Sequence, residues 1–204
     1  MARFVGRENV RKRLEPLAGT PGRTTYADGA ARIETADETI TVRPPFGLAQ
    51  ARVYERVELA PLFEALAEDR VVAALLVRLG GYAVGVFEGE RLVSSKVGTR
   101  FVKGRHKKGG SSANRFGRRR EEQERALVDA AAETAARVLD PYRERIEFVA
   151  LGGDRAAASR VAERLPWLAE KTLPRFFTVA DPRQRELERL PYDLYAAELS
   201  EEPG

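Results

Sequence analysis

The sequence VVAALLVRLGGYAVGVFEGERLVSSKV occupies residues 71–97 and predicts three consecutive strands. Val71–Leu79 is a nearly continuous run of apolar residues, which is typical of a strand covered on both faces. Gly80-Gly81 suits the positive φ angles of a tight hairpin turn, and Glu88-Gly89-Glu90 predicts a second turn. The stretch therefore predicts an antiparallel meander. Its last strand, continuing to Val102, leads into a strongly basic segment.

After the basic segment, the pattern changes to helices alternating with strands. A helix is expected from Arg115 or Phe116 to Leu139, where Asp140-Pro141 ends it. One of its faces carries Leu127, Ala131, Thr134 and Val138 at helical spacing. The following elements are expected to be a strand, a helix, a strand and a helix, at residues 146–151, 155–165, 176–179 and 182–190. Strands separated by helices normally lie parallel, so the pattern predicts an α/β fold with one mixed sheet.

Residues 1–70 predict a small α+β accessory region without a catalytic pattern. A helix is expected at residues 7–18, a hairpin from residues 32–35 and 39–43, and a second helix at residues 59–69. Residues 71–190 then form the main domain. The acidic residues 191–204 are expected to be a loose C-terminal tail.

The composition limits the classes of protein to consider. The chain has 204 residues, of which 43% are hydrophobic and 32% charged, as in soluble globular proteins. It has no cysteine, which excludes disulfides, thiol nucleophiles and cysteine-ligated metals. The N-terminal sequence MARFVGRENV lacks the apolar core of a signal peptide, and no apolar run reaches the roughly 18 residues of a membrane span. We therefore expect a cytoplasmic protein that does not bind membranes.

The basic segment, Lys96–Arg120, holds ten lysines and arginines, the single histidine and no acid. The net charge of the whole chain is only +4, so this excess is local. A local excess of this kind indicates a polyanion partner such as nucleic acid. The arginines at the start of the expected helix oppose the helix dipole, which an anion bound there would explain. The alternative is that they simply solvate an exposed helix face.

Within this segment, residues 109–120 have the sequence GGSSANRFGRRR. This sequence closely resembles the catalytic loop of archaeal and eukaryotic class-I peptide-chain release factors, whose pattern is Gly-Gly-Gln-Ser-Ala-x-Arg-Phe-x-Arg-x-Arg. The resemblance covers about residues 71–190 and is closest to the actinobacterial branch of Vms-like release factors. It implies an RNase H-like fold and a peptidyl-tRNA hydrolase that releases nascent peptides from stalled ribosomal complexes. The implied partners are the large ribosomal subunit and peptidyl-tRNA, with no DNA and no cofactor, and we expect a monomer.

The resemblance assigns catalytic and RNA-binding residues, but the family's glutamine is replaced. Ser111 stands in the position of that glutamine, and Ser112 stands where the Vms relatives carry theirs. The implied catalytic residues are Gly109, Gly110, Ser111, Ser112 and Asn114. The implied RNA-binding residues are Arg105, His106, Lys107, Lys108, Arg115, Arg118, Arg119 and Arg120.

Two interpretations of this replacement stay open. Backbone amides, serine hydroxyls or Asn114 orient the attacking water, or the protein binds ribosomes or tRNA and has lost hydrolysis. A metal-dependent nuclease is a third class of enzyme. It would need a carboxylate cluster that the strands predicted between residues 71 and 102 lack, so no metal is expected.

Overall fold

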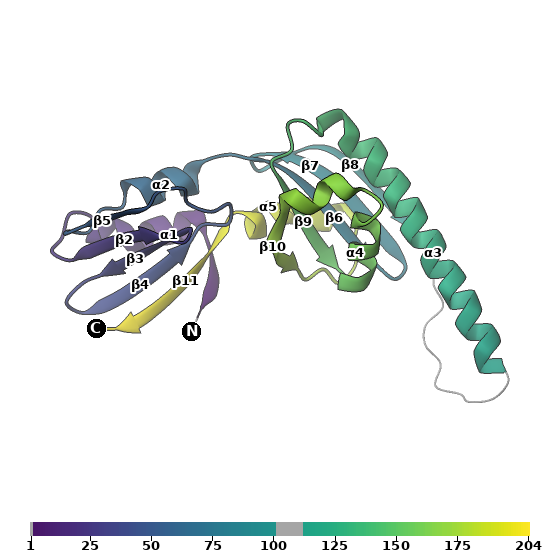
Figure 1. The fold of residues 1–204 in the computed structure, drawn as a ribbon, viewed down its shortest axis with the longest axis horizontal. Helices are drawn as coiled ribbons and strands as arrows, with labels where there is room; N and C mark the ends of the chain where they lie inside the picture. Colours follow the sequence, from purple (N-terminus) through teal and green to yellow (C-terminus); the bar gives the residue numbers. More distant parts are fainter. Residues whose placement is uncertain (1, 101–111) are drawn as a thin grey trace. The chain divides into compact units, whose positions relative to one another are not determined.

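The computed structural model describes residues 2–100 and 112–204, without the side chains of residues 112–117 and 119. The chain divides into two compact units. The terminal unit combines Met1–Asp69 with Leu190–Gly204, and the central unit is Arg70–Arg189. Figure 1 labels most of the helices and strands of both units.

The central unit is built on a five-stranded mixed sheet with the order β10-β9-β6-β7-β8. Antiparallel pairing joins β6 to β7 and β7 to β8, which confirms the predicted meander, while β9 lies parallel to both β6 and β10. Its strands are β6 (Val71–Arg78), β7 (Gly81–Glu88), β8 (Arg91–Thr99), β9 (Phe148–Gly153) and β10 (Thr172–Phe177).

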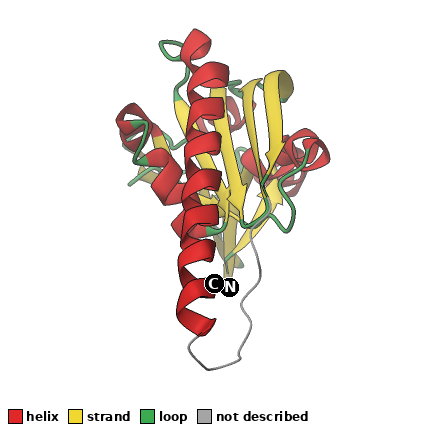
Figure 2. Ribbon diagram, turned by 90° about the vertical axis from the view of Figure 1, so that its right-hand side faces the viewer, coloured by secondary structure: helices red, strands yellow, loops and turns green. Residues whose placement is uncertain are grey.

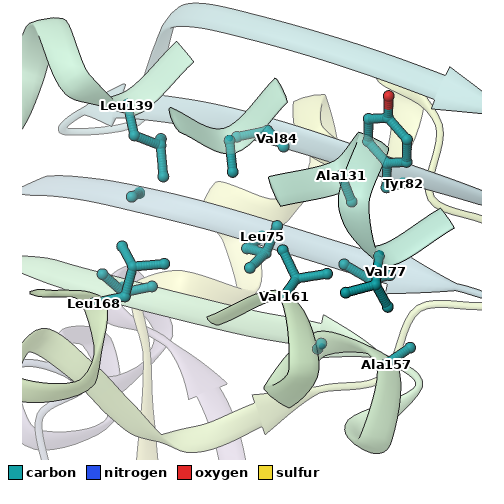
Figure 3. Packing of buried hydrophobic residues seen from close by; sticks show 14 of the residues in the cluster. Leu75, Val77, Tyr82, Val84, Ala131, Leu139, Ala157, Val161 and Leu168 are labelled. Atoms are coloured by element: carbon teal, nitrogen blue, oxygen red, sulfur yellow. The ribbon is translucent and has the colours of Figure 1, made fainter. Parts of the chain in front are cut away.

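Helices cover both faces of this sheet. One face carries α3 (Ser112–Leu139) and α4 (Arg155–Ala162), which share an apolar core with β6, β7 and β9 (Figure 3). The other face carries α5 (Gln184–Leu194). Gly85 of β7 faces this side, since its neighbours Val84 and Val86 point to the α3 and α4 face. A Cβ placed on Gly85 would lie only 3.2 Å from Cδ2 of Leu187 on α5. The expected order of helices and strands is therefore confirmed. The helix α3 begins three residues earlier than expected, and α5 begins two residues later and continues past Pro191.

Strand β6 is the centre of the central unit. Every residue from Val72 to Val77 is 0% exposed, which confirms that the strand is covered on both faces. The two sets of side chains alternate, so that Leu75 and Val77 point to the α3 and α4 face. Burial on both faces explains why the run contains no polar residue.

The junction between β9 and α4 requires a glycine. The φ angle of Gly153 is +94°, and a Cβ there would lie 2.2 Å from the carbonyl oxygen of Val77 on β6. The backbone N–H of Asp154 donates to that same oxygen at 2.7 Å. The Asp154 side chain then accepts a hydrogen bond from the N–H of Ala157 at 2.9 Å and caps α4. Gly153 thus lets the chain turn from strand to helix directly against β6.

The terminal unit is a six-stranded antiparallel sheet with the order β1-β11-β4-β3-β2-β5. Its buried face packs against two short helices that supply Val10, Leu14, Leu62 and Leu66 to a separate apolar core. Its elements are β1 (Arg3–Gly6), α1 (Arg7–Leu14), β2 (Arg23–Ala27), β3 (Ala30–Glu34), β4 (Glu38–Arg43), β5 (Arg52–Tyr54), α2 (Ala60–Ala67) and β11 (Ala196–Pro203). The expected hairpin is the pair β3 and β4.

The expectation of a loose C-terminal tail is wrong. Residues 196–203 form β11, which pairs with β1 on one side and β4 on the other. Ala197 and Leu199 point into the core of the terminal unit and are 0% and 1% exposed. Glu201 binds the guanidinium groups of Arg3 and Arg13 at 3.0 and 2.9 Å. Ala197 and Leu199 show the two-residue period of a strand with one buried face, but Glu201 continues the same series, so the charge of the segment hid this short pattern.

The hairpin of β2 and β3 was also missed by the sequence analysis. Asp28-Gly29 connects these strands, with φ angles of 51° and 71°. Two positive φ angles in a two-residue turn are typical of a type I′ hairpin, for which Asp-Gly is a preferred sequence. Tyr26, at the end of β2, is 1% exposed, and its hydroxyl donates to the carbonyl oxygen of Glu58 at 2.7 Å. Burial raises the pKa of this tyrosine above its ordinary value.

We predict that Gly153→Ala destabilises the central unit more than Gly80→Ala does, by about 2 kcal/mol. Both glycines have positive φ angles, +94° and +113°, but a Cβ at Gly80 would have no atom within 4 Å. The two variants therefore share the backbone strain, and only the first adds a collision with β6. The single tryptophan, Trp167, lies in the central unit, so its fluorescence during urea unfolding reports this unit. Equal losses of stability would contradict the steric explanation.

Candidate functional site

The centre of the predicted catalytic loop lies outside the described residues. This applies to Arg105, His106, Lys107, Lys108, Gly109, Gly110 and Ser111. Their proposed roles stay predictions from the sequence. The structure describes the elements on either side of the loop: β8, which ends at Thr99, and α3, which begins at Ser112.

The helix α3 contains part of the predicted loop. Ser112, Asn114 and Arg115 are in its first turn, because the helix begins at Ser112. The helix therefore includes Ser112, Ala113 and Asn114, which precede its first basic residue, Arg115. No acidic residue is present in this first turn. The positive end of the helix dipole is left without a carboxylate of its own helix, and anions are favoured at such an end.

The N-terminal part of α3 extends beyond the core of the central unit. The first buried side chain described along the helix is Leu127. Residues 112–126, which we call the projecting part, lie before Leu127 in the helix and span about 22 Å at the helical rise of about 1.5 Å per residue. Figure 2 shows α3 running along the sheet and continuing past its end. The fold thus places the start of the helix, with the predicted site residues, away from the sheet.

The arginines of the projecting part have different surroundings. Arg118 is exposed, which suits the predicted contact with RNA phosphates. Arg120 is 25% exposed, and its Nε donates to Glu124 at 2.8 Å. The second carboxylate oxygen of Glu124 lies 3.9 Å from Arg160 of α4. Arg120 therefore supports the helix, and its Nε is already bonded; the side chain of Arg119 is outside the described set.

A buried hydrogen bond joins the sheet to α3 near the end of β8. The hydroxyls of Tyr82 on β7 and Thr134 on α3 lie 3.0 Å apart, and their residues are 8% and 7% exposed. Tyr82 is paired with Gly98 of β8, and a Cβ at Gly98 would lie 2.3 Å from the tyrosine ring. The sequence analysis placed Thr134 on the core face but missed this contact. A glycine inside a strand, and a polar residue within an alanine-rich helix face, are the signals that indicate it.

The described residues contain no candidate metal centre. In residues 2–100 and 112–204, no three histidine or carboxylate side chains are grouped so that they could hold a metal ion. None of the helices in these ranges is long and apolar enough to span a membrane.

The comparison with known protein families assigns the chain to a family. The sequence model of the Actinobacteria/chloroflexi VLRF1 release factor family matches residues 70–200. The chain belongs to this family. The match covers the whole central unit and extends into β11 of the terminal unit. The resemblance to the actinobacterial branch of Vms-like release factors is therefore confirmed.

The chain is also similar to individual release factors and solved structures. Peptide chain release factor subunit 1 from Archaeoglobus fulgidus is 26% identical over 155 residues, which are 74% of this chain and 38% of that protein. The chain thus spans well under half the length of this curated relative. Among solved structures, archaeal translation termination factor aRF1 has a TM-score of 0.48 at 19% identity, with 92% of this chain and 54% of the other covered. The Vms1 mitochondrial localization core has a TM-score of 0.43 at 12% identity, with 94% and 80% covered.

We predict that Glu124→Gln loosens the projecting part of α3. The substitution removes the charge that pairs with Arg120 and Arg160, which lowers the local stability of the helix by about 0.5 kcal/mol. Amide hydrogen exchange of residues 118–126 should then become about twofold faster. Glu122→Gln is the matched control, because Glu122 is exposed on the same part of the helix. Equal exchange rates in both variants would show that the ion pairs of Glu124 do not stabilise this helix.

Proposed function

We propose that this VLRF1 release factor hydrolyses the ester that joins a nascent peptide to tRNA on stalled ribosomal complexes, in ribosome rescue. The observation that carries the proposal is the match of Gly109–Arg120 to the release-factor loop, in a chain whose residues 70–200 match a release factor family. The ribosome and peptidyl-tRNA are the corresponding partners. The proposed location is the cytoplasm, and the proposed state is a monomer.

In the proposed reaction, the oxygen of a water molecule bonds to the ester carbonyl carbon. The bond from that carbon to the ribose oxygen of the tRNA breaks, and a proton from the water passes to the ribose oxygen. The backbone amides of Gly110 and Ser111, with the hydroxyls of Ser111 and Ser112 or the amide of Asn114, orient the water. Placing the reactants in this way can supply much of the rate without a strong acid or base.

The proposed role of the arginines and lysines is to bind RNA phosphates around the ester. The exposure of Arg118 and the absence of acids in the first turn of α3 support this role. Guanidinium groups and helix N-termini both suit phosphate oxygens. We further propose that the central unit is RNase H-like. Its strand order supports this, because an antiparallel three-stranded meander is continued by β9, parallel to β6, and then by β10, parallel to β9.

The second candidate function is that of a non-catalytic factor that binds ribosomes or tRNA. The observation that favours it is Ser111 and Ser112, where relatives carry the loop glutamine. In this case the protein keeps the basic surface and has lost hydrolysis.

We predict that the purified protein converts peptidyl-tRNA to free peptide on stalled ribosome–nascent-chain complexes, resolved by gel electrophoresis. Gly110→Leu should slow release about 100-fold or more and leave ribosome binding unchanged, because a side chain there blocks approach to the ester. The matched control is Gly104→Leu, in the same basic segment but outside the loop motif.

The two candidate functions give opposite results in this assay. If peptidyl-tRNA persists at stoichiometric protein, on complexes shown by co-sedimentation to carry it, the hydrolase proposal is wrong and the binding factor is supported.

We predict that the affinity for ribosomal complexes falls steeply with salt, because phosphate contacts release counterions. Arg118→Glu together with Arg119→Glu should weaken binding at every salt concentration and reduce the slope of log K against log salt by about 1 for each phosphate that is no longer neutralised. Arg137→Glu is the control, an exposed arginine at the other end of α3. An affinity that does not change with salt would contradict a phosphate-binding surface.

A further inference from the structure

We infer that the buried Tyr82–Thr134 hydrogen bond sets the position of α3 on the sheet and thereby the place to which the helix carries the loop. These two residues are positioning residues and do not touch the substrate. The part of the inference that concerns peptide release rests on the proposed function, whereas the part that concerns the helix does not.

Two residues that are unfavourable in their local element, Gly98 and Thr134, meet the buried hydroxyl of Tyr82 at this contact. Gly98 lies inside β8, where glycine weakens a strand. Thr134 lies on a helix face beside Ala131 and Ala135, and threonine costs about 0.5 kcal/mol relative to alanine within a helix. Tyr82 places a hydroxyl in a core whose other members are mostly aliphatic. Such locally unfavourable residues beside a buried polar group are expected where a specific geometry is required.

The hydrogen bond is directional, whereas the contacts around it are not. Ala131, Ala135 and Val84 belong to the same apolar core, and Figure 3 shows Ala131 and Val84 within it. Apolar contacts of this kind have no preferred direction. A shift of one residue would separate the two hydroxyls. Leaving a buried hydroxyl without a partner costs about 1–3 kcal/mol. This cost selects the position of α3 in which Thr134 faces Tyr82.

Gly98 connects this contact to the strand that enters the basic segment. The Tyr82 ring occupies the space that a side chain at Gly98 would fill, and β8 ends at the next residue, Thr99. One contact therefore ties together the strand that leads into the segment and the helix that leaves it. The elements at both ends of the proposed loop, β8 and α3, therefore contact the same residue of the core, Tyr82.

Because α3 is long, a small change in its tilt at this contact produces a larger displacement at its N-terminus. Thr134 follows Ser112 by 22 positions, which is about 33 Å along the helix axis. A tilt of about 2° at Thr134 then moves Ser112 by about 1 Å. A misplacement of about 1 Å at a reacting centre can slow a reaction about 100-fold. Precision at this hydrogen bond therefore matters at the far end of the helix.

The test measures the position of the helix directly. The chain contains no cysteine, so a pair of cysteines can be introduced for spin labels without background. Suitable positions are Glu122, exposed on the projecting part, and Leu79, 41% exposed in the turn after β6. In the labelled full-length protein we expect a narrow distance distribution, and Tyr82→Phe or Thr134→Val should broaden or shift it.

The double variant Tyr82→Phe/Thr134→Val separates a positioning role from a merely structural one. Replacing both hydroxyls leaves no unpaired buried group, so thermal stability should recover relative to the single variants. The distance distribution should stay broad, because the directional contact is still missing. Tyr26→Phe is the matched control, since it also removes a tyrosine hydroxyl that is bonded at 2.7 Å, in the other unit. It should lower stability without changing the measured distance.

An unchanged distance distribution in Tyr82→Phe and Thr134→Val, whatever their stability, would overturn the inference. A double variant whose distance recovers together with its stability would also overturn it. On stalled ribosomal complexes, Tyr82→Phe should slow peptide release about tenfold or more, and Tyr26→Phe should not. If the wild-type protein releases no peptide, the proposed function fails, and the distance measurement still decides the positioning role.

Discussion

The burial of β6 on both faces is the constraint on which the central unit depends. Its residues from Val72 to Val77 are fully buried, and each valine or leucine contributes about 1.5–3 kcal/mol when both faces are covered. Burying both faces of β6 requires helices on each side of the sheet. The strand β9 lies parallel to β6, so the chain needs a crossover connection before β9. The helix α3 lies in that crossover. Its attachment to the sheet, and the direction in which its first turns project, therefore follow from the same burial.

The terminal unit depends on a second constraint, the pairing of the C-terminal strand β11 with β1 and β4. The strand β11 brings the last residues of the chain between β1 and β4, so residues from both ends of the sequence share one apolar core. The family match also extends into this strand. The central unit is thus an insertion between two segments that fold together, and its own ends, Arg70 and Arg189, continue directly into the terminal unit.

The sequence predicted the central unit better than the terminal unit, for physical reasons. The runs of β6 and β7 are apolar on both faces, and Gly80 and Gly89 mark the turns with positive φ angles. In the terminal unit, β11 supplies Ala197 and Leu199 to the core and carries Glu198, Glu201 and Glu202, so its charge masked its period. The proposed catalytic loop was predicted from residue order alone, whereas the Tyr82–Thr134 contact joins residues 52 positions apart, whose pairing depends on the packing of α3.

The proposed chemistry explains why such a distant contact matters. The residues assigned to catalysis are glycines, serines and an asparagine, none of which is a strong acid or base near neutral pH. A site of this composition acts by placing water and the ester correctly, and its rate then depends on position more than on proton affinity. The proposed site includes the first turn of a helix in which the first buried side chain described is Leu127. In this proposal the attachment of α3 through Tyr82, Gly98 and Thr134 contributes to the precision of the site.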